Sequence, residues 1–104
     1  MSPHRFHILA ALADRDLHGS GIVRDVLQQT KGELRLWPAT LYGTLDDLEA
    51  EGLIRELHGD DRPAGVSERR RYYRIRPEGR DALRTEAGRL SGMAEIARGR
   101  LRGS

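Results

Sequence analysis

Residues 37–57 read WPATLYGTLDDLEAEGLIREL and carry the clearest structural pattern in the chain. The proline near its start suits the first position of a helix, because its missing amide has no partner there. Leu41, Leu45 and Leu48 follow at steps of four and three, which is the spacing of one buried helix face. After a glycine that ends this helix, residues 53–57 change period and predict a short strand. The segment therefore predicts a helix that leads directly into a β-hairpin.

Two further helices are predicted upstream of this segment. Ser2 and Pro3 supply a cap and a first-turn proline, and apolar residues then recur at helical spacing through Ala13. Residues 18–21 read HGSG and predict a turn, after which a second helix begins. The inner face of that second helix is formed by Ile22, Val26 and Leu27.

Downstream, the pattern predicts a loop, a second strand and a long final helix. Residues 58–67 contain two glycines, a proline and two aspartates, which favours a loop. Residues 69–75 then alternate in the manner of a strand, so they form a hairpin with the strand at 53–57. Pro77 opens the last helix, which runs to about Leu101.

The last helix carries a heptad seam. A helix of about 25 residues would be about 37 Å long, which exceeds the body of a chain of this size. We therefore expect the seam to pack partly on the first helix and partly on a second subunit, which gives a homodimer. The residues predicted for dimerisation are Phe6, Leu83, Ala87, Leu90, Ala94, Ala97 and Leu101.

Charge is distributed unevenly, although the formal net charge is only +2. Residues 46–61 hold seven acidic residues and one basic residue, a balance of −6. Residues 62–80 hold seven arginines and two acidic residues, a balance of +5. A basic block of this kind is typical of a nucleic-acid-binding surface, although a solvated charged surface would show the same balance.

Three helices followed by a β-hairpin is the order of a winged helix-turn-helix. The predicted fold class is mainly α with a small β-hairpin, extended by a long C-terminal helix. With 104 residues the chain is expected to form one compact unit. Within it, residues 1–76 are expected to be the winged helix-turn-helix DNA-binding domain and residues 77–104 the C-terminal dimerisation helix.

The third helix and the second strand hold the candidate contacts to double-stranded DNA. With the three leucines facing the core, small residues face outward, where they allow the helix to approach base edges in the major groove. Arginines of the hairpin would reach phosphates. The predicted DNA-binding residues are Ala39, Thr40, Tyr42, Gly43, Arg69, Arg70 and Arg71.

The chain also resembles the PadR-family transcriptional regulators over about residues 5–101. The resemblance is carried by FHILAALA at 6–13, HG at 18–19, PATLY at 38–42, LEAEGLI at 48–54, RRYYRI at 70–75 and PEGR at 77–80. The chain is similar to the short subfamily, in which one C-terminal helix mediates dimerisation. The resemblance implies a dimeric repressor that binds a roughly palindromic operator and is released by a small molecule or another signal.

The sequence departs from the family pattern at four positions. Ser20 stands where a tyrosine is usual in the turn, and Gly43 stands where relatives often carry a basic residue. Arg76 occupies a position where threonine usually caps the last helix, and Trp37 one where serine or glycine is common. The flat indole of Trp37 is the candidate contact for an effector of unknown identity.

Several function classes are disfavoured by what the sequence lacks. The chain has no cysteine, and no metal-ligand pattern joins its four histidines, so we predict no metal site. No glycine-rich phosphate loop or nucleophile motif is present, so we predict no catalytic residue, cofactor or enzymatic activity. No segment reads as a signal peptide or a membrane span, which favours the cytoplasm.

The main alternative is a winged-helix protein-interaction module that binds no DNA. The acidic stretch at 46–61 favours it, because Asp46 and Asp47 would repel phosphate unless they face cytosine amino groups or point away. The arginines at 69–71 and the dimer seam favour the regulator instead. RNA binding would require more exposed aromatic residues than the sequence offers.

Overall fold

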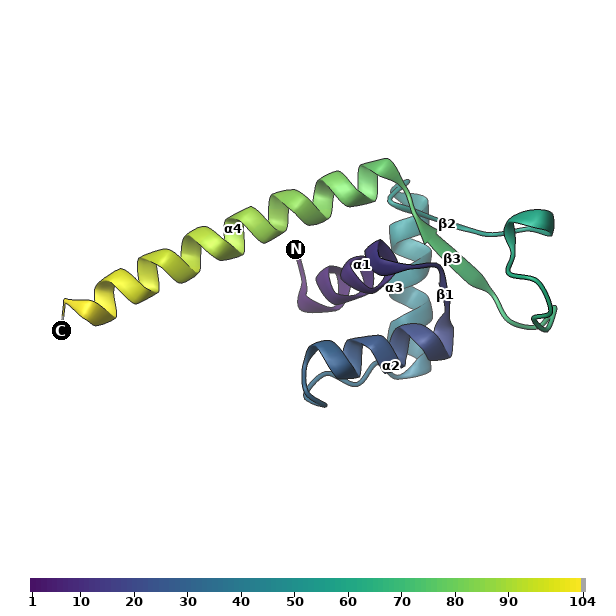
Figure 1. Cartoon of the computed structure of the whole chain (residues 1–104), viewed down its shortest axis with the longest axis horizontal. Coiled ribbons are helices and arrows are strands. Elements are labelled where there is room, and N and C mark those ends of the chain that lie inside the picture. The colour runs from purple at the N-terminus through teal and green to yellow at the C-terminus, as the bar shows by residue number, and fades with distance from the viewer. Residues whose placement is uncertain (104) are drawn as a thin grey trace.

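The structure, a computed structural model, describes residues 1–103, and Ser104, the last residue of the expected dimerisation segment, lies outside the described residues. Within this range the α-helices are α1 (Pro3–Asp14), α2 (Gly19–Gln29), α3 (Pro38–Ala50) and α4 (Pro77–Arg102). The strands are β1 (Leu17–His18), β2 (Ile54–Glu56) and β3 (Tyr72–Ile75), and a 3₁₀ turn, η1, covers Gly59–Asp61. Figure 1 shows a body formed by α1, α2, α3 and the strands, from which α4 extends away.

One apolar core lies between the first three helices and the sheet. Ile8 of α1, Ile22 of α2 and Leu45 of α3 are fully buried in it. Leu41 and Leu48 also face this core, so the orientation predicted for α3 from its leucine spacing is confirmed. Burial of each such side chain stabilises the folded state by about 1.5–3 kcal/mol relative to its exposure to water. The opposite face of α3 is therefore held toward solvent.

The strands form an antiparallel sheet in the order β1-β3-β2. β3 pairs with β2 through Ile75 opposite Ile54, and with β1 through Tyr73 opposite Leu17. The mainly α fold with a hairpin and a long C-terminal helix is therefore present. Strand β1 is an addition to it, and it ties the start of α2 to the hairpin.

Two local predictions are wrong in part. A turn is predicted at 18–21, but His18 is the last residue of strand β1 and Gly19 is the first residue of helix α2. The strand predicted over 69–75 is shorter, because β3 begins only at Tyr72. The three arginines before it lie in turn and loop conformation, where their charged side chains are exposed to water.

Helix ends coincide with the caps and stops expected from the sequence. Ser2 caps α1, because its hydroxyl accepts a hydrogen bond from the amide of Arg5 at 3.3 Å. Gly52 follows α3 with a φ of 75°, in the left-handed region that favours glycine. The tight turn lets the amide of Leu53 donate to the carbonyl of Leu48 at 2.9 Å and directs the chain into β2.

Helix α4 packs on α1 and then leaves the body, as Figure 1 shows. Its first turn is held close by Gly79, because a Cβ there would overlap the backbone carbonyl oxygen of Leu53. Because α4 extends beyond the body, the molecule is 56 Å long, against 27 and 22 Å in the other two directions. None of the helices within residues 1–103 is long and apolar enough to cross a membrane.

Candidate nucleic-acid interface

The outer face of α3 presents small side chains to solvent. Ala39, Thr40 and Gly43 are exposed, and a Cβ on Gly43 would meet no neighbouring atom within 4 Å. The hydroxyl of Thr44 donates to the carbonyl of Thr40 at 2.8 Å, so it is bonded within the helix. This face can therefore approach another surface closely, as a helix in the major groove must.

Tyr42 stands at the edge of that face and is 40% exposed. Its hydroxyl oxygen lies 2.5 Å from the position that a Cβ on Gly19 would take. Gly19 is buried at the start of α2, so the missing side chain creates the space that the tyrosine fills. Tyr42 therefore sets the spacing between α2 and α3 and still offers part of its ring to a ligand.

The wing, residues 57–71 between β2 and β3, has a defined shape. The guanidinium of Arg62 donates to the backbone carbonyls of Ser67 at 2.6 Å and of Arg70 at 2.7 Å. Arg55 at the base of the wing donates to Asp61 at 3.3 Å. Hydrogen bonds from a charged donor are stronger than neutral ones, so Arg62 closes the tip of the wing on itself.

Arg70 lies on the side of the hairpin that faces β1 and α2. Its charge acts on His18 of β1, since the pKa of this histidine is lowered by burial and, further, by the charges of Arg70 and of Arg24 on α2. The His18 imidazole also contacts the ring of Tyr72, with 5.2 Å between the ring centroids. The charges of Arg24 and Arg70 thus both act on His18 and favour its neutral form. Sequence reasoning missed Arg24, because only the pairing of β1 with β3 brings it near the wing.

Arg71 lies on the other side of the hairpin, toward β2 and α3. Its pKa is raised by a hydrogen bond with the Tyr73 hydroxyl, by the charge of Glu56 and, more weakly, by that of Asp46. The two neighbouring arginines therefore have opposite surroundings, and the charge of Arg71 is partly offset by the protein's own carboxylates. Arg69, the third arginine of the set, is exposed.

The acidic end of α3 is engaged within the molecule. Both carboxylate oxygens of Glu51 accept hydrogen bonds from Arg5 of α1, each at 2.7 Å. Glu49 accepts a hydrogen bond from the backbone amide of Glu56 at 2.8 Å. Asp47 is exposed, and its charge also acts on Arg5. These carboxylates join α3 to α1 and β2, which gives the acidic stretch a role inside the fold.

Comparison with known proteins identifies the family of the chain. The profile of the transcriptional regulator PadR-like family matches residues 8–85, which is most of the chain. The chain belongs to the PadR-like family. Its members are transcriptional regulators, so this PadR-like chain is not an enzyme.

The chain is also similar to individual proteins from several bacteria. The transcriptional regulator Rv3488 of Mycobacterium tuberculosis is 39% identical over 91 residues, which cover 86% of this chain and 78% of the relative. A 37.1 kDa protein in transposon TN4556 of Streptomyces fradiae is 41% identical over 88 residues, which cover 82% of this chain but only 23% of that longer protein. The solved structure of a transcriptional regulator from Clostridium thermocellum matches with a TM-score of 0.75 and 26% identity, covering 90% of this chain and 85% of that one.

Trp37, the predicted effector contact, precedes α3 and is 63% exposed. The guanidinium carbon of Arg35 lies over its indole, 4.7 Å from the ring centroid, in a cation–π contact. Trp37 lines neither of the two cavities described below. Its role as an effector contact therefore stays a prediction.

Helix α4 divides the predicted dimerisation residues of this PadR-like chain into two groups. Leu83 packs against the core, whereas Leu90 is 38% exposed and lines a groove with Phe6 of α1. The groove has a volume of about 370 Å³. Ala94 is half-buried, and the exposed members of the set are Ala87, Ala97 and Leu101.

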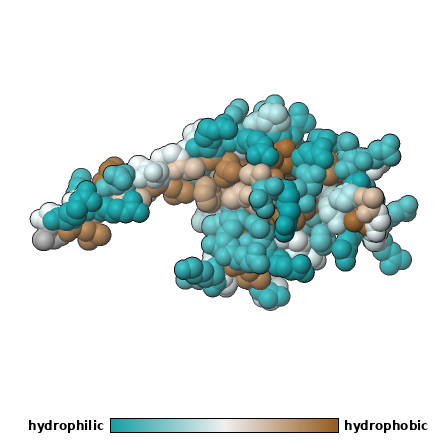
Figure 2. Space-filling view, viewed as in Figure 1, coloured by the Kyte–Doolittle hydropathy of each residue, from teal (hydrophilic) through white to brown (hydrophobic). Residues whose placement is uncertain are grey.

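The part of α4 that extends beyond the body exposes apolar residues that do not belong to the predicted heptad seam. Met93 is 53% exposed and Ile96 is 62% exposed. Sequence reasoning missed both, because the heptad line that it follows passes beside them. Figure 2 shows hydrophobic atoms along α4 where it leaves the body and again near its free end. Exposed apolar surface of this kind is typical of an interaction site.

Glu86 is buried at the groove between α1 and α4, with 6% exposure. Its carboxylate accepts hydrogen bonds from Arg89 at 2.6 and 2.7 Å and lies 3.4 Å from the amino group of Met1. The hydrogen bonds from Arg89 are the largest cause that lowers the pKa of Glu86 to about 2. Glu86 therefore stays ionised beside an apolar groove.

Within residues 1–103, no group of three or more histidine, cysteine, aspartate or glutamate side chains could hold a metal ion. His7 has a structural contact instead, because its Nδ1 lies 2.7 Å from Oε1 of Gln29. The amide of Gln29 also donates to the backbone carbonyl of His7 at 3.0 Å and to Asp25 at 2.9 Å. His7 thus helps to join α1 to α2.

Proposed function

We propose that this PadR-like chain is a dimeric, sequence-specific repressor that acts in the cytoplasm and is released by a small molecule or another signal. Residues 1–76 bind double-stranded operator DNA, and residues 77–104 hold the dimer together. The observation that carries the proposal is a helix face of small residues beside an arginine-rich wing. Base readout and phosphate binding would then come from two separate surfaces.

In this proposal α3 enters the major groove with its exposed face toward the bases. Ala39, Thr40 and Gly43 are small enough to bring the helix backbone close to base edges. Tyr42 contributes the exposed part of its ring, while its hydroxyl stays packed on Gly19. Glu51 is paired with Arg5 of α1 and Glu49 accepts a hydrogen bond from β2, which reduces the repulsion of phosphate by these two carboxylates.

Arg70 is the main phosphate contact of the wing in this proposal, and Arg69 lies beside it. The surroundings of Arg70 favour it, because its side chain is exposed and it acts on His18, whose pKa is lowered by burial and by the charges of Arg70 and Arg24. Arg71 contributes less, since it forms a hydrogen bond with Tyr73 and the charges of Glu56 and Asp46 partly offset its own. A second copy of the same surface, supplied by the partner subunit, would contact the other half of the operator.

The test measures affinity against salt concentration, first on DNA from upstream of the protein's own gene and then on random DNA. Arg70→Ala is expected to weaken binding to both and to flatten the plot of log affinity against log salt by about 0.9 per lost contact, or about 1.8 per dimer. Arg71→Ala is expected to change the slope less. Arg84→Ala is the matched control, because Arg84 is an equally charged, exposed residue on α4.

Substitutions on α3 should behave differently from those on the wing. Thr40→Ala and Gly43→Ala are expected to change the preference among operator variants by about 1–3 kcal/mol per misread base pair, with little change in salt slope. If Arg70→Ala keeps the wild-type slope, the wing does not clamp phosphates.

A protein-interaction module is the second candidate function, and the exposed indole of Trp37 favours it. Interfaces between proteins are enriched in such aromatic residues. If the wild-type chain binds no DNA in a salt-sensitive manner, this module replaces the regulator as the better account.

A further inference from the structure

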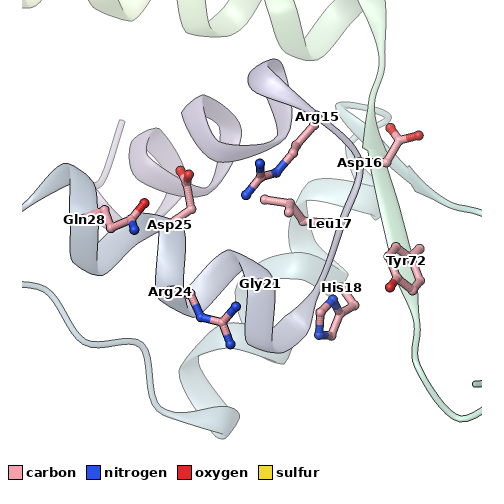
Figure 3. A pocket seen from close by; sticks show the side chains of 9 residues that line it. All are labelled: Arg15, Asp16, Leu17, His18, Gly21, Arg24, Asp25, Gln28 and Tyr72. Carbon is pink, nitrogen blue, oxygen red and sulfur yellow. The ribbon is translucent and has the colours of Figure 1, made fainter. Parts of the chain in front are cut away.

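A cavity of about 310 Å³ lies on the body, away from the outer face of α3. It is formed by the segment from Arg15 through β1, by one side of α2, and by Tyr72 of β3. Figure 3 shows the side chains that surround it, with Arg15 entering from the end of α1 and Arg24, Asp25 and Gln28 from α2. The volume is at the lower end of the range for small-molecule sites.

Two guanidinium groups border this cavity and lack a counter-ion among residues 1–103. Neither Arg15 nor Arg24 forms an ion pair or a side-chain hydrogen bond with any of residues 1–103. They belong to different elements, since Arg15 follows α1 and Arg24 lies within α2. A carboxylate placed between them could accept hydrogen bonds from both, and Arg suits this geometry because its donors form a planar fork.

The two carboxylates of the lining are not equivalent. Asp16 is engaged by Arg74, whose guanidinium donates to it at 2.7, 3.1 and 3.2 Å. Asp25 accepts one hydrogen bond, from the amide of Gln29 at 2.9 Å to its Oδ2, and its other oxygen has no bond to any of residues 1–103. Asp25 therefore keeps acceptor capacity that a positively charged group could use.

One wall of the cavity is apolar. Leu17 is 7% exposed and Tyr72 is 8% exposed, and both are held by the pairing of β1 with β3. The ring of His18 packs against the ring of Tyr72 in a tilted arrangement. A ligand that fills the cavity would therefore place its charged groups near α2 and an apolar part against the sheet.

We propose that this cavity binds a zwitterion of the α-amino acid class with a small apolar side chain. Arg15 and Arg24 bind the ligand's carboxylate, Asp25 binds its ammonium group, and Leu17 and Tyr72 contact its side chain. A plain anion fits less well, because Asp25 would repel it, and a plain cation would meet the two arginines. Since Tyr72 is the first residue of β3, the ligand would touch the strand that directly follows the wing and its Arg70.

The experiment titrates the full chain with L-leucine, isocaproate and isoamylamine and follows backbone amide resonances by NMR. Isocaproate lacks only the ammonium group of leucine, and isoamylamine lacks only its carboxylate. L-Leucine is expected to bind with shifts confined to residues 15–28 and 72. Each analogue is expected to bind about tenfold more weakly or worse, as for the loss of one charge-assisted hydrogen bond.

Three variants test which side chain binds which charged group of leucine. Arg24→Gln and Arg15→Gln should each weaken leucine binding about tenfold, and Asp25→Asn should abolish the preference for leucine over isocaproate. Arg84→Gln on α4 removes an exposed arginine elsewhere and should leave binding unchanged. Circular dichroism of each variant confirms that it is folded.

The proposal is overturned if leucine causes no localised shifts, if isocaproate binds as tightly as leucine, or if Arg84→Gln weakens binding as much as Arg24→Gln. It is also overturned if Arg24→Gln flattens the salt dependence of DNA binding while leucine does not bind, because the cavity would then be part of the DNA surface. The titration contains no DNA, so its result is independent of the function proposed above.

Discussion

The two halves of α4 follow the same apolar period but have opposite surroundings. In the first half, Gly79 and Glu86 are buried and Leu83 packs against the core. In the second half, Met93 and Ile96 are mostly exposed. A heptad seam therefore shows where a helix needs a partner, without showing whether its own chain supplies one. In this protein the chain supplies a partner, α1, for the first half of α4.

The largest effect is expected at the junction of the two halves. Leu90→Glu places a charge in the apolar seam, and that charge would lose its water when two subunits associate. We therefore predict that the wild-type chain is a dimer at micromolar concentration and that Leu90→Glu converts it to a monomer. Sedimentation equilibrium measures both states.

Thr85→Glu is the matched control for this dimer prediction, because Thr85 is exposed and lies outside the seam. It should leave the dimer intact. A wild-type chain that sediments as a monomer of 11.7 kDa at high concentration would show that the second half of α4 has no second subunit as its partner.

A pair of glycine substitutions compares the two halves directly. Gly79→Ala is expected to lower the free energy of unfolding by about 1–3 kcal/mol, because the new methyl group would overlap the carbonyl of Leu53. Gly92→Ala meets no neighbour within 4 Å and should raise the same free energy by up to about 1 kcal/mol, as in any exposed helix. Urea denaturation measures both. Equal effects would contradict the contrast between the halves.

The pH dependence of stability tests the role of Glu86, the buried carboxylate in the first half of α4. The folded-state pKa of Glu86 is lowered to about 2 from 4.5, so its stabilising contribution is complete above the unfolded value and is lost as the pH falls toward 2. The free energy of unfolding should therefore fall more steeply with acidification in wild type than in Glu86→Gln. Denaturation curves between about pH 5 and pH 2 provide the measurement. Parallel slopes would show that Glu86 titrates alike in both states.

A smaller effect than that of Gly79→Ala is expected at Arg76, the residue directly before α4. Arg76 makes no side-chain cap, and its charge opposes the helix dipole. Its ion pair with Glu78, at 3.4 Å between half-exposed side chains, contributes little. Arg76→Thr should therefore raise the free energy of unfolding by about 0.5–2 kcal/mol. No gain in a thermal melt would assign Arg76 another role.

The helices could be predicted from the sequence because their signals are local. Pro38 and Pro77 begin α3 and α4, and the leucine period of α3 sets which of its faces is buried. Strand β1 could not be predicted in this way, since its two residues are too short to show alternation. It exists only because Leu17 pairs with Tyr73, far along the chain.

The candidate site shows the same division. The exposed residues of α3 follow from one local period. The surroundings of Arg70 and Arg71 do not, because His18 and Glu56, which distinguish them, come from other strands. The cavity beside Arg24 is also lined by β1, so it could not be predicted from any sequence motif.

The bonds that Arg62 makes across the wing have a thermodynamic consequence. Fixing one residue of a flexible loop costs about 1–2 kcal/mol of conformational entropy. Here the two bonds to the carbonyls of Ser67 and Arg70 order the backbone during folding. A ligand that meets the wing therefore finds it pre-organised. Calorimetry of that encounter should lack the large opposing enthalpy and entropy changes of segments that fold as they bind.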